Sequence, residues 1–395
     1  MLELAPRLKP FSSEAGLTSD KCPILPPLFK QAGGRAVFLA LLLALVSACA
    51  LGSDPAGEEL PDPVCASGQI DGEVVVASQV GTIAPTLINE FERRYGVDVV
   101  EVFYESDDEL LSRVIAGADP FDVLFVRDDL AAILRRGGSL HTLDPIALPG
   151  MIHLDSDFLG SPLESEGLYS VPIVWGTVGI GMNLNALQDS FESDWGMVFD
   201  LSSAWFSAGR ISLLDNPRQA LAAAMFHLGY SPNSTDRSQV REAAQLISEA
   251  GAHLDGFDSE NYATRLINGG LDLAQGRSDD FLAALPPDSA NFLYVIPDDG
   301  AAIWVEVLTV PITSQNPCSA HTFIDFVLEP RMGALTADYL GEATTNTASL
   351  AYLSIETAAN PTLYPPPETR DRLELLHFTE ELDLLYAEEY ALFVE

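Results

Sequence analysis

The stretch Tyr169–Asn183, YSVPIVWGTVGIGMN, runs for fifteen residues without a charged side chain. Such a gap is unusual because the whole chain is 20% charged and carries a formal net charge of -38. Three interpretations fit a glycine-spaced apolar run: a nucleotide-binding fingerprint, a strand of one core, or a strand that passes between two domains. The glycines are spaced G-x-x-G-x-G, the reverse of the dinucleotide fingerprint, and no helix pattern follows closely, which argues against the first interpretation.

The segments around this stretch alternate between strand and helix patterns. Short β-branched runs at 73–78, 97–104 and 121–126 alternate with amphipathic patterns at 84–96, 106–117 and 127–138, and the same alternation returns at 209–215, 216–230, 235–251, 271–276 and 292–297. Strand–helix–strand units at this pitch predict parallel α/β sheets. A second long apolar strand is predicted at Ala302–Pro311. We expect two α/β blocks joined by at least these two uncharged strands, which would have no solvent-facing side.

Composition excludes one class of partner. The sequence has 58 acidic and 20 basic residues and a pI of about 4.2. Its three lysines, Lys9, Lys21 and Lys30, all precede residue 31. A surface this negative repels phosphate backbones, so we expect no nucleic-acid partner.

The N-terminus predicts a targeting segment. Arg35 precedes an apolar run from Ala36 to Ala48, which is too short to span a bilayer but fits the hydrophobic part of a secretory signal. The run ends in Val46-Ser47-Ala48-Cys49, which looks like a bacterial lipobox, so we expect a signal peptide at 1–48 and lipidation of Cys49. The alternative is an ordinary signal peptide cut nearby. The leader before the apolar run is unusually long.

A flexible tether is predicted after the lipidated cysteine. Residues 49–70 are rich in glycine, proline and acidic side chains. Cys65 and Cys318 would lie in an oxidising compartment, where a disulfide between them can form. Their separation in sequence does not show whether the two cysteines are close in space, so the sequence leaves this disulfide undecided.

No catalytic or metal-binding pattern is found. The sequence contains neither a P-loop nor a G-x-S-x-G nucleophile elbow, and its six histidines have no paired-ligand spacing. We therefore expect no enzyme activity, no metal and no cofactor.

The order of several short motifs resembles a known family. The motifs are Phe103-Tyr104-Glu105-Ser106, Tyr169–Pro172 continuing through Trp175-Gly176, Ile180-Gly181 and Asn183, Leu214-Asp215 with Arg218, Leu228–Ser231, Tyr294–Pro297 and Gly300–Glu306. They resemble the periplasmic spermidine/putrescine-binding proteins of polyamine ABC importers over about residues 73 to 390. The resemblance implies a two-lobed α/β periplasmic-binding-protein fold with crossing hinge strands, similar to type II. It also implies a solute captured in the cleft between the lobes.

The resemblance implies positions for the ligand site, and most of them are changed in this chain. Gln79 and Thr82 stand where the family has aromatic residues, and Arg127 and Asp129 stand where it has Ser and Tyr. Asn216 and Gln219 replace two acids, Arg277 replaces a cleft Trp, and Glu342 replaces a Tyr. Trp304 is kept, and Glu306 stands where the family has Asp. These ten residues are the predicted ligand-binding set.

For four of these residues, a purely structural role without ligand contact also remains open. Asn216 could be only a helix cap, Gln219 and Arg277 could be solvated surface, and Trp304 could be core. Glu306 is the firmest position because an acid within an apolar strand needs a cationic partner.

Three hypotheses for the ligand follow. A zwitterion could place its ammonium at Trp304 and Glu306 and its carboxylate at Arg127 or Arg277. Alternatively, the arginines pair internally with Asp129 and Glu342, and Glu306 holds a polyamine weakly. In the third hypothesis the cleft has lost its ligand.

We therefore expect a monomeric, lipid-anchored, extracytoplasmic receptor that passes a small cationic or zwitterionic solute to an ABC permease. Lobe 1 is predicted at 71–172 and 307–343, and lobe 2 at 173–306 and 344–395. The alternative function is a non-transporting sensor or surface lipoprotein with a degenerate cleft, and a hydrolase ranks third.

Overall fold

The computed structural model describes residues 64–117, 119–159, 168–186, 193–200, 210–284 and 291–394. The predicted signal peptide at 1–48, Cys49 and most of the tether lie outside these ranges. Within them, none of the helices combines the length and apolar character that a membrane crossing requires.

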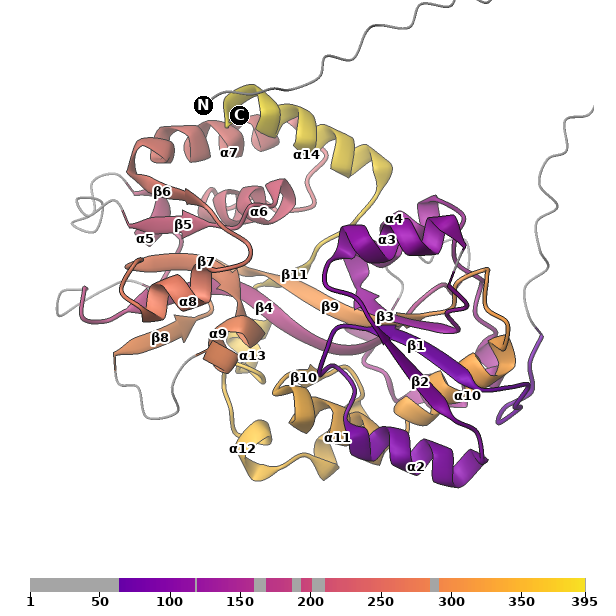
Figure 1. Ribbon diagram of the computed structural model, residues 1–395. Coiled ribbons are helices and arrows are strands. Elements are labelled where there is room, and N and C mark those ends of the chain that lie inside the picture. The colour runs from indigo at the N-terminus through magenta and orange to yellow at the C-terminus, as the bar shows by residue number, and fades with distance from the viewer. Residues whose placement is uncertain are drawn as a thin grey trace, which may run out of the picture. The chain divides into compact units, whose positions relative to one another are not determined.

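A mixed β-sheet runs through the structure, with β4 and β9 at its centre (Figure 1). The order along its main path is β2-β1-β3-β9-β4-β7-β5-β6. The strands of the described residues are β1 (Val74–Ser78), β2 (Val99–Phe103), β3 (Val123–Arg127), β4 (Val171–Asn183), β5 (Ile211–Leu213), β6 (Leu254–Phe257), β7 (Leu273–Arg277), β8 (Phe292–Val295), β9 (Ala301–Thr309), β10 (Ala343–Thr344) and β11 (Leu373–Leu375).

β4 explains the uncharged stretch. All of its residues are buried, and it has neighbours on both edges. β9 and β8 pair with one edge, and β10 and β7 pair with the other, all in antiparallel register. With no face or edge in water, the strand has no position for a charged side chain. The predicted strand is confirmed.

Two glycines of this stretch are required by side chains that pack on it. A Cβ at Gly176 would collide with the Trp304 indole and Ser278 Oγ, and a Cβ at Gly181 would collide with the Phe281 ring. The glycine spacing therefore follows ring packing, and no phosphate loop is formed.

We call the strands β1–β3 with the helices that cover them block 1. β1 pairs in parallel with β2 and β3, and β3 continues the sheet antiparallel to β9. The helices are α2 (Pro85–Tyr95), α3 (Asp107–Ala116), α4 (Asp128–Arg136), α10 (Pro317–Val327) and α11 (Pro330–Leu340). Phe91 of α2 packs edge-on against Phe323 and Phe326 of α10, so the helix beyond β9 belongs to this core.

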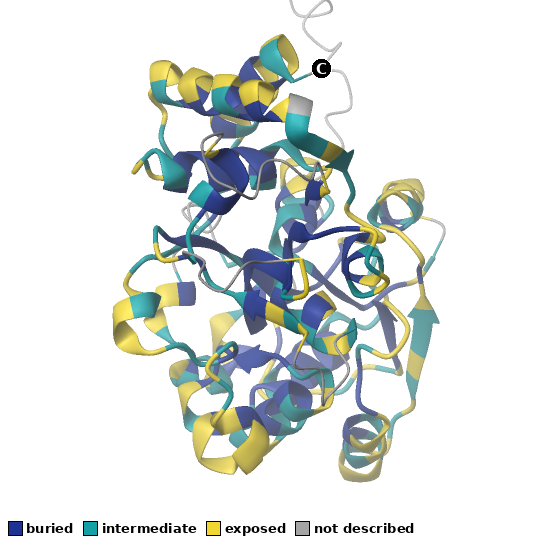
Figure 2. Ribbon diagram, turned by 90° about the vertical axis from the view of Figure 1, so that its left-hand side faces the viewer, coloured by how far each residue is buried: buried dark blue, intermediate teal, exposed yellow. Residues whose placement is uncertain are grey.

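Block 2 repeats this architecture around β5–β7. β5 pairs in parallel with β6 and β7, and β7 is antiparallel to β4. The helices are α5 (Gly196–Phe199), α6 (Pro217–His227), α7 (Arg237–Ala250), α8 (Tyr262–Ile267), α9 (Ser278–Ala284) and α14 (Glu380–Phe393). Two short helices, α12 (Ile355–Ala358) and α13 (Pro367–Arg370), follow β10. Figure 2 shows the central strands and inner helix faces buried and the outer helix turns exposed, and the edge strand β2 has no buried residue.

The expected helix signals are confirmed. Ser106 caps α3 by accepting a hydrogen bond from the Glu109 amide, and Gly96 ends α2 in the left-handed conformation. Asn216 caps α6, with Pro217 in the first turn. The alternating pattern therefore predicted the element types in both blocks.

A disulfide joins Cys65 to Cys318, the first turn of α10. This is the pairing that the sequence left open. It fixes the beginning of the described chain to block 1.

Candidate functional site

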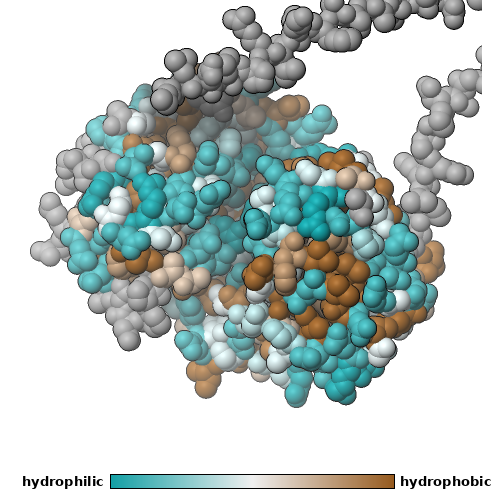
Figure 3. All heavy atoms as spheres, viewed as in Figure 1, coloured by the Kyte–Doolittle hydropathy of each residue, from teal (hydrophilic) through white to brown (hydrophobic). Residues whose placement is uncertain are grey.

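A cavity of about 530 Å³ lies where the ends of β3, β7 and β9 meet the first turn of α6. Figure 3 shows a surface that is hollowed between the two blocks and largely hydrophilic there, whereas hydrophobic side chains gather near β1 and β2. The cavity is lined by all ten residues of the predicted set: Gln79, Thr82, Arg127, Asp129, Asn216, Gln219, Arg277, Trp304, Glu306 and Glu342. The structure thus brings the whole set together. Their contact with a ligand remains a prediction.

The cavity is strongly acidic. Seven carboxylate residues line it, Asp128, Asp129, Asp215, Asp279, Asp280, Glu306 and Glu342, and the only cationic side chains in this described lining are those of Arg127 and Arg277. Low-dielectric walls strengthen the field of this excess, which favours a cationic occupant.

Arg127, at the end of β3, is neutralised within the protein. Its Nη2 donates to Asp107 at the start of α3, and its Nε lies 3.6 Å from Asp129 Oδ1. Burial raises the pKa of Asp107, and the Arg127 charge opposes this. The pairing with Asp129 agrees with the second ligand hypothesis, whereas Asp107 was not anticipated from sequence.

Arg277, at the end of β7, is paired with a different acid from the one expected. Its Nε donates to Asp279 Oδ1 at 3.0 Å, and its Nη2 donates to Asp279 Oδ2. The guanidinium lies over the Trp304 indole, 4.4 Å from the ring centroid. The expected pairing with Glu342 is therefore wrong. Asp279 is only two residues away in the chain and forms the fork-shaped pair more readily.

Asp280 is also engaged. It accepts a hydrogen bond from the Tyr262 hydroxyl, which in turn accepts one from the Arg277 amide. Burial raises the pKa of Asp280, with Asp279 adding to the effect. This chain of contacts fixes the end of β7 and the start of α9.

Among the described residues, Glu306 and Glu342 form no ion pair, and neither do the lining acids Asp128 and Asp215. Glu342 is 6% exposed, and its Oε2 has no hydrogen-bond partner among the described residues. Burial, together with the nearby Glu306 charge, raises the pKa of Glu342 to about 10. Burial also raises the pKa of Glu306, which Arg277 and Arg127 oppose. A buried and a partly buried carboxyl that share one region without an ion pair favour a ligand that supplies a cation.

Asn216 and Gln219 enter the cavity from the first turn of α6. The Asn216 side-chain oxygen accepts hydrogen bonds from the Arg218 and Gln219 amides, so the capping interpretation is confirmed. The Gln219 side-chain oxygen is buried and has no hydrogen-bond partner among the described residues. Gln219 is therefore not simply solvated surface.

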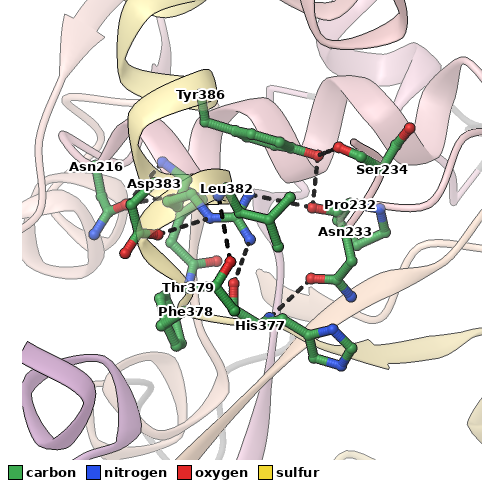
Figure 4. Close-up of polar contacts among 12 residues, drawn as sticks. Asn216, Pro232, Asn233, Ser234, His377, Phe378, Thr379, Leu382, Asp383 and Tyr386 are labelled. Carbon is green, nitrogen blue, oxygen red and sulfur yellow. Dashed lines mark hydrogen bonds and ion pairs between the residues drawn. The ribbon is translucent and has the colours of Figure 1, made fainter. Parts of the chain in front are cut away.

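The C-terminal segment closes one side of the cavity through Phe378. Figure 4 shows how this segment is held. The His377 amide donates to Asn233 Oδ1 at 2.8 Å, and the Tyr386 hydroxyl donates to the carbonyl of Pro232 at 2.8 Å. The segment is thus bound to the loop after α6.

Arginines from both blocks also meet at this segment. Arg218 of α6 stacks on Tyr386 and lies 3.8 Å from Asp383. Arg136, in α4 of block 1, donates to the carbonyl of Phe378 at 3.0 Å and pairs with Asp383 at 3.1 Å. Asp383 therefore links an arginine of block 1 to an arginine of block 2.

A signal for the missed acids was present in the sequence. Two of the strands that reach the cavity, β3 and β7, end in an arginine with two acids close behind it: Arg127-Asp128-Asp129 at β3, and Arg277-Ser278-Asp279-Asp280 at β7. A comparison of the two strand ends would have predicted Asp279 as the partner of Arg277. Asp107 and Tyr262 come from neighbouring helices and carry no such signal.

Within the described part of the chain, no cluster of His, Cys, Asp and Glu has the arrangement of a metal site. The cavity combines buried acids, amides and an aromatic ring, an arrangement suited to binding an organic cation.

Most of the described chain matches one known protein family. The family described as bacterial extracellular solute-binding protein matches residues 86–365.

Two curated relatives extend the comparison. The putrescine/cadaverine-binding protein of Pseudomonas aeruginosa is 29% identical over 301 residues, covering 74% of this chain and 85% of that protein. The spermidine/putrescine-binding periplasmic protein of Escherichia coli is 26% identical over 310 residues, covering 78% and 87%.

Solved structures show the same fold. A spermidine/putrescine ABC transporter substrate-binding protein from Streptococcus pneumoniae has a TM-score of 0.73 at 24% identity, covering 82% of this chain and 98% of that one. A lipoprotein of Treponema pallidum has a TM-score of 0.69 at 25% identity, covering 81% and 98%. The two-lobed solute-binding architecture is therefore confirmed.

Proposed function

Because this chain belongs to the bacterial extracellular solute-binding proteins, we propose that it captures a small polyamine-like cation in the acidic cavity and delivers it to an ABC permease. The relatives named for putrescine, cadaverine and spermidine support this ligand class. The cavity supports it independently through its charge.

The observation that carries the proposal is the pair Glu306 and Glu342. A buried carboxylate without a cation is costly; Glu342 is buried with an unpartnered oxygen, and the partly buried Glu306 lies in the same cavity. An ammonium group between them supplies the missing charge and lets both acids ionise. Both arginines of the lining already have carboxylate partners, which disfavours the zwitterion hypothesis.

The proposed mechanism is capture by closure. Block 1 and block 2 supply opposite walls of the cavity and are connected through the paired strands β4 and β9. We propose the lobe boundaries 71–172 with 307–343, and 173–306 with 344–395. A ligand that contacts both walls then favours the closed arrangement.

We propose further that the protein works outside the cytoplasm, as a monomer, without catalysis. Cys49 would carry a lipid, and the residues up to the disulfide at Cys65 would serve as a tether. Cys49→Ser should release the protein from the membrane fraction. Continued membrane association of this variant would contradict the lipid anchor.

Calorimetric titration with putrescine, spermidine and a set of neutral amino acids tests the ligand class. We expect saturable binding of at least one polyamine and none of the neutral amino acids. Glu306→Gln should weaken polyamine binding by about 100-fold, because it removes a charge that contacts an ammonium group.

The matched control is Glu105→Gln, at an exposed acid outside the cavity lining, which should leave the affinity unchanged. Absence of heat with every polyamine would contradict the proposal. Unchanged affinity in Glu306→Gln would show that this acid is not a contact.

A further inference from the structure

The Arg277 guanidinium covers the main aromatic ring of the cavity. It lies 4.4 Å from the Trp304 ring centroid and is held there by two hydrogen bonds to Asp279. Its amide is also fixed, through the Tyr262 hydroxyl. The cation above the indole is thus a built-in part of the site.

Little of the indole remains for a ligand. Trp304 is 3% exposed, and the backbone of Gly176 packs so closely on its six-membered ring that a Cβ there would collide. Because an aromatic face attracts one cation at close range, Arg277 takes the place that a ligand ammonium or its methylene chain would otherwise fill.

The acids near this ring are occupied as well. Asp279 is neutralised by Arg277, and Asp280 accepts the Tyr262 hydrogen bond. Glu306 and Glu342 form no ion pair among the described residues, and the Glu306 charge acts on Glu342. The acids beside the ring are therefore occupied, and a ligand ammonium would bind at these two glutamates or at the unpaired lining acids Asp128 and Asp215.

We propose that Arg277 is a specificity-determining residue: by occupying the indole face itself, it restricts the cavity to compact cations and disfavours a longer triamine. A diamine can place its charges at the two glutamates. The third ammonium of a triamine would meet the Arg277 charge and would find the Trp304 face already covered. This inference rests on the proposed function of the same cavity.

Calorimetry on the full chain with putrescine as the diamine and spermidine as the triamine tests the inference. The wild type should bind putrescine about tenfold more tightly than spermidine. The double variant Arg277→Ala/Asp279→Ala removes one positive and one negative charge, so the net charge of the cavity is unchanged. It should shift the affinity ratio about tenfold or more toward spermidine, because the ring face becomes free.

The matched control is Arg113→Ala/Asp119→Ala, which removes an arginine–acid pair outside the cavity lining without uncovering the indole. It should change the ratio by less than about twofold. Thermal unfolding of both variants verifies that they are folded. If Arg277→Ala/Asp279→Ala does not fold, Arg277→Gln provides the test, since it keeps a polar side chain but removes the guanidinium charge over the ring.

Equal shifts in both double variants, or an unchanged ratio in the folded Arg277 variants, would overturn the inference while leaving the proposed function intact. A wild type that binds spermidine as tightly as putrescine would do the same. Binding of neither amine to any of these proteins would contradict the proposed function and this inference with it.

Discussion

The burial of Glu342 supports the proposed binding of a cation in the cavity. An apolar or amide side chain at this buried position would make the folded protein more stable. The chain instead has a carboxyl group, whose pKa is raised to about 10 by burial and by the Glu306 charge. Such a residue lowers stability in the absence of a cation. We infer that binding is the reason for its presence.

The pH dependence of this penalty can be predicted. Below about pH 4.5 the carboxyl is protonated in both the folded and the unfolded chain, so it makes no difference. As the pH rises toward 10, the unfolded chain releases the proton and the folded chain keeps it, so stability falls. Glu342→Gln cannot ionise and should therefore be more stable than the ligand-free wild type at pH 8, by roughly 2 kcal/mol in the free energy of unfolding. At pH 4.5 the two should be nearly equal.

Chemical denaturation at the two pH values measures this difference. Glu356→Gln, at an exposed acid of α12, is the control and should match the wild type at both. If Glu342→Gln is less stable than the wild type at pH 8, the carboxyl is ionised and satisfied in the native protein, and the argument for a missing cation fails.

Single residues were also where sequence reasoning was least complete. All ten residues that the family resemblance implied line the cavity, whereas other lining residues such as Asp128, Asp215 and Phe378 were not predicted. The pairing of Arg277 with Asp279 was also missed, although both strand ends place an acid two residues after the arginine. Asp107 and Tyr262 come from neighbouring helices, and strand and helix patterns do not encode such contacts.

At the level of elements, β4 could be predicted because two-sided burial removes charge from its sequence, and β9 because it is long and apolar apart from Glu306. The short strands β10 and β11 could not be predicted. They have two and three residues and depend on the strands they pair with, β4 and β9. Only long, regular segments carry enough pattern for a prediction.

The contact between α4 and α14 joins the two blocks, and its effect on ligand release can be tested. Arg136 of α4 binds Asp383 and the Phe378 carbonyl, which belong to the segment packed on block 2. Because this partly buried contact joins the two blocks beside the cavity, its loss should favour opening. Arg136→Gln should increase the dissociation rate of a bound polyamine by about three- to tenfold.

Stopped-flow dissociation measures this rate. The control is Arg241→Gln, which breaks a salt bridge to Glu389 of the same helix, α14, but within block 2. The control should dissociate at the wild-type rate. Equal rates in all three proteins would show that the α4–α14 contact does not hold the blocks together.

For the whole molecule, the two-block architecture followed from the alternation of strands and helices and from the two uncharged strands. The sequence could not decide between an internally neutralised cavity and one that binds a zwitterion, because that depends on contacts between α3, β3, β7 and α9. The structure shows both arginines neutralised from within and Glu306 and Glu342 without an ion pair among the described residues. The excess of carboxyl groups over cations between the blocks connects the fold with the proposed function.

A crystal structure of the full chain grown with putrescine tests this claim most directly. We predict an ammonium group within hydrogen-bonding distance of Glu306 and Glu342, with Arg277 still stacked on Trp304. A diamine found outside the cavity, or a cavity that holds only solvent at saturating putrescine, would contradict it.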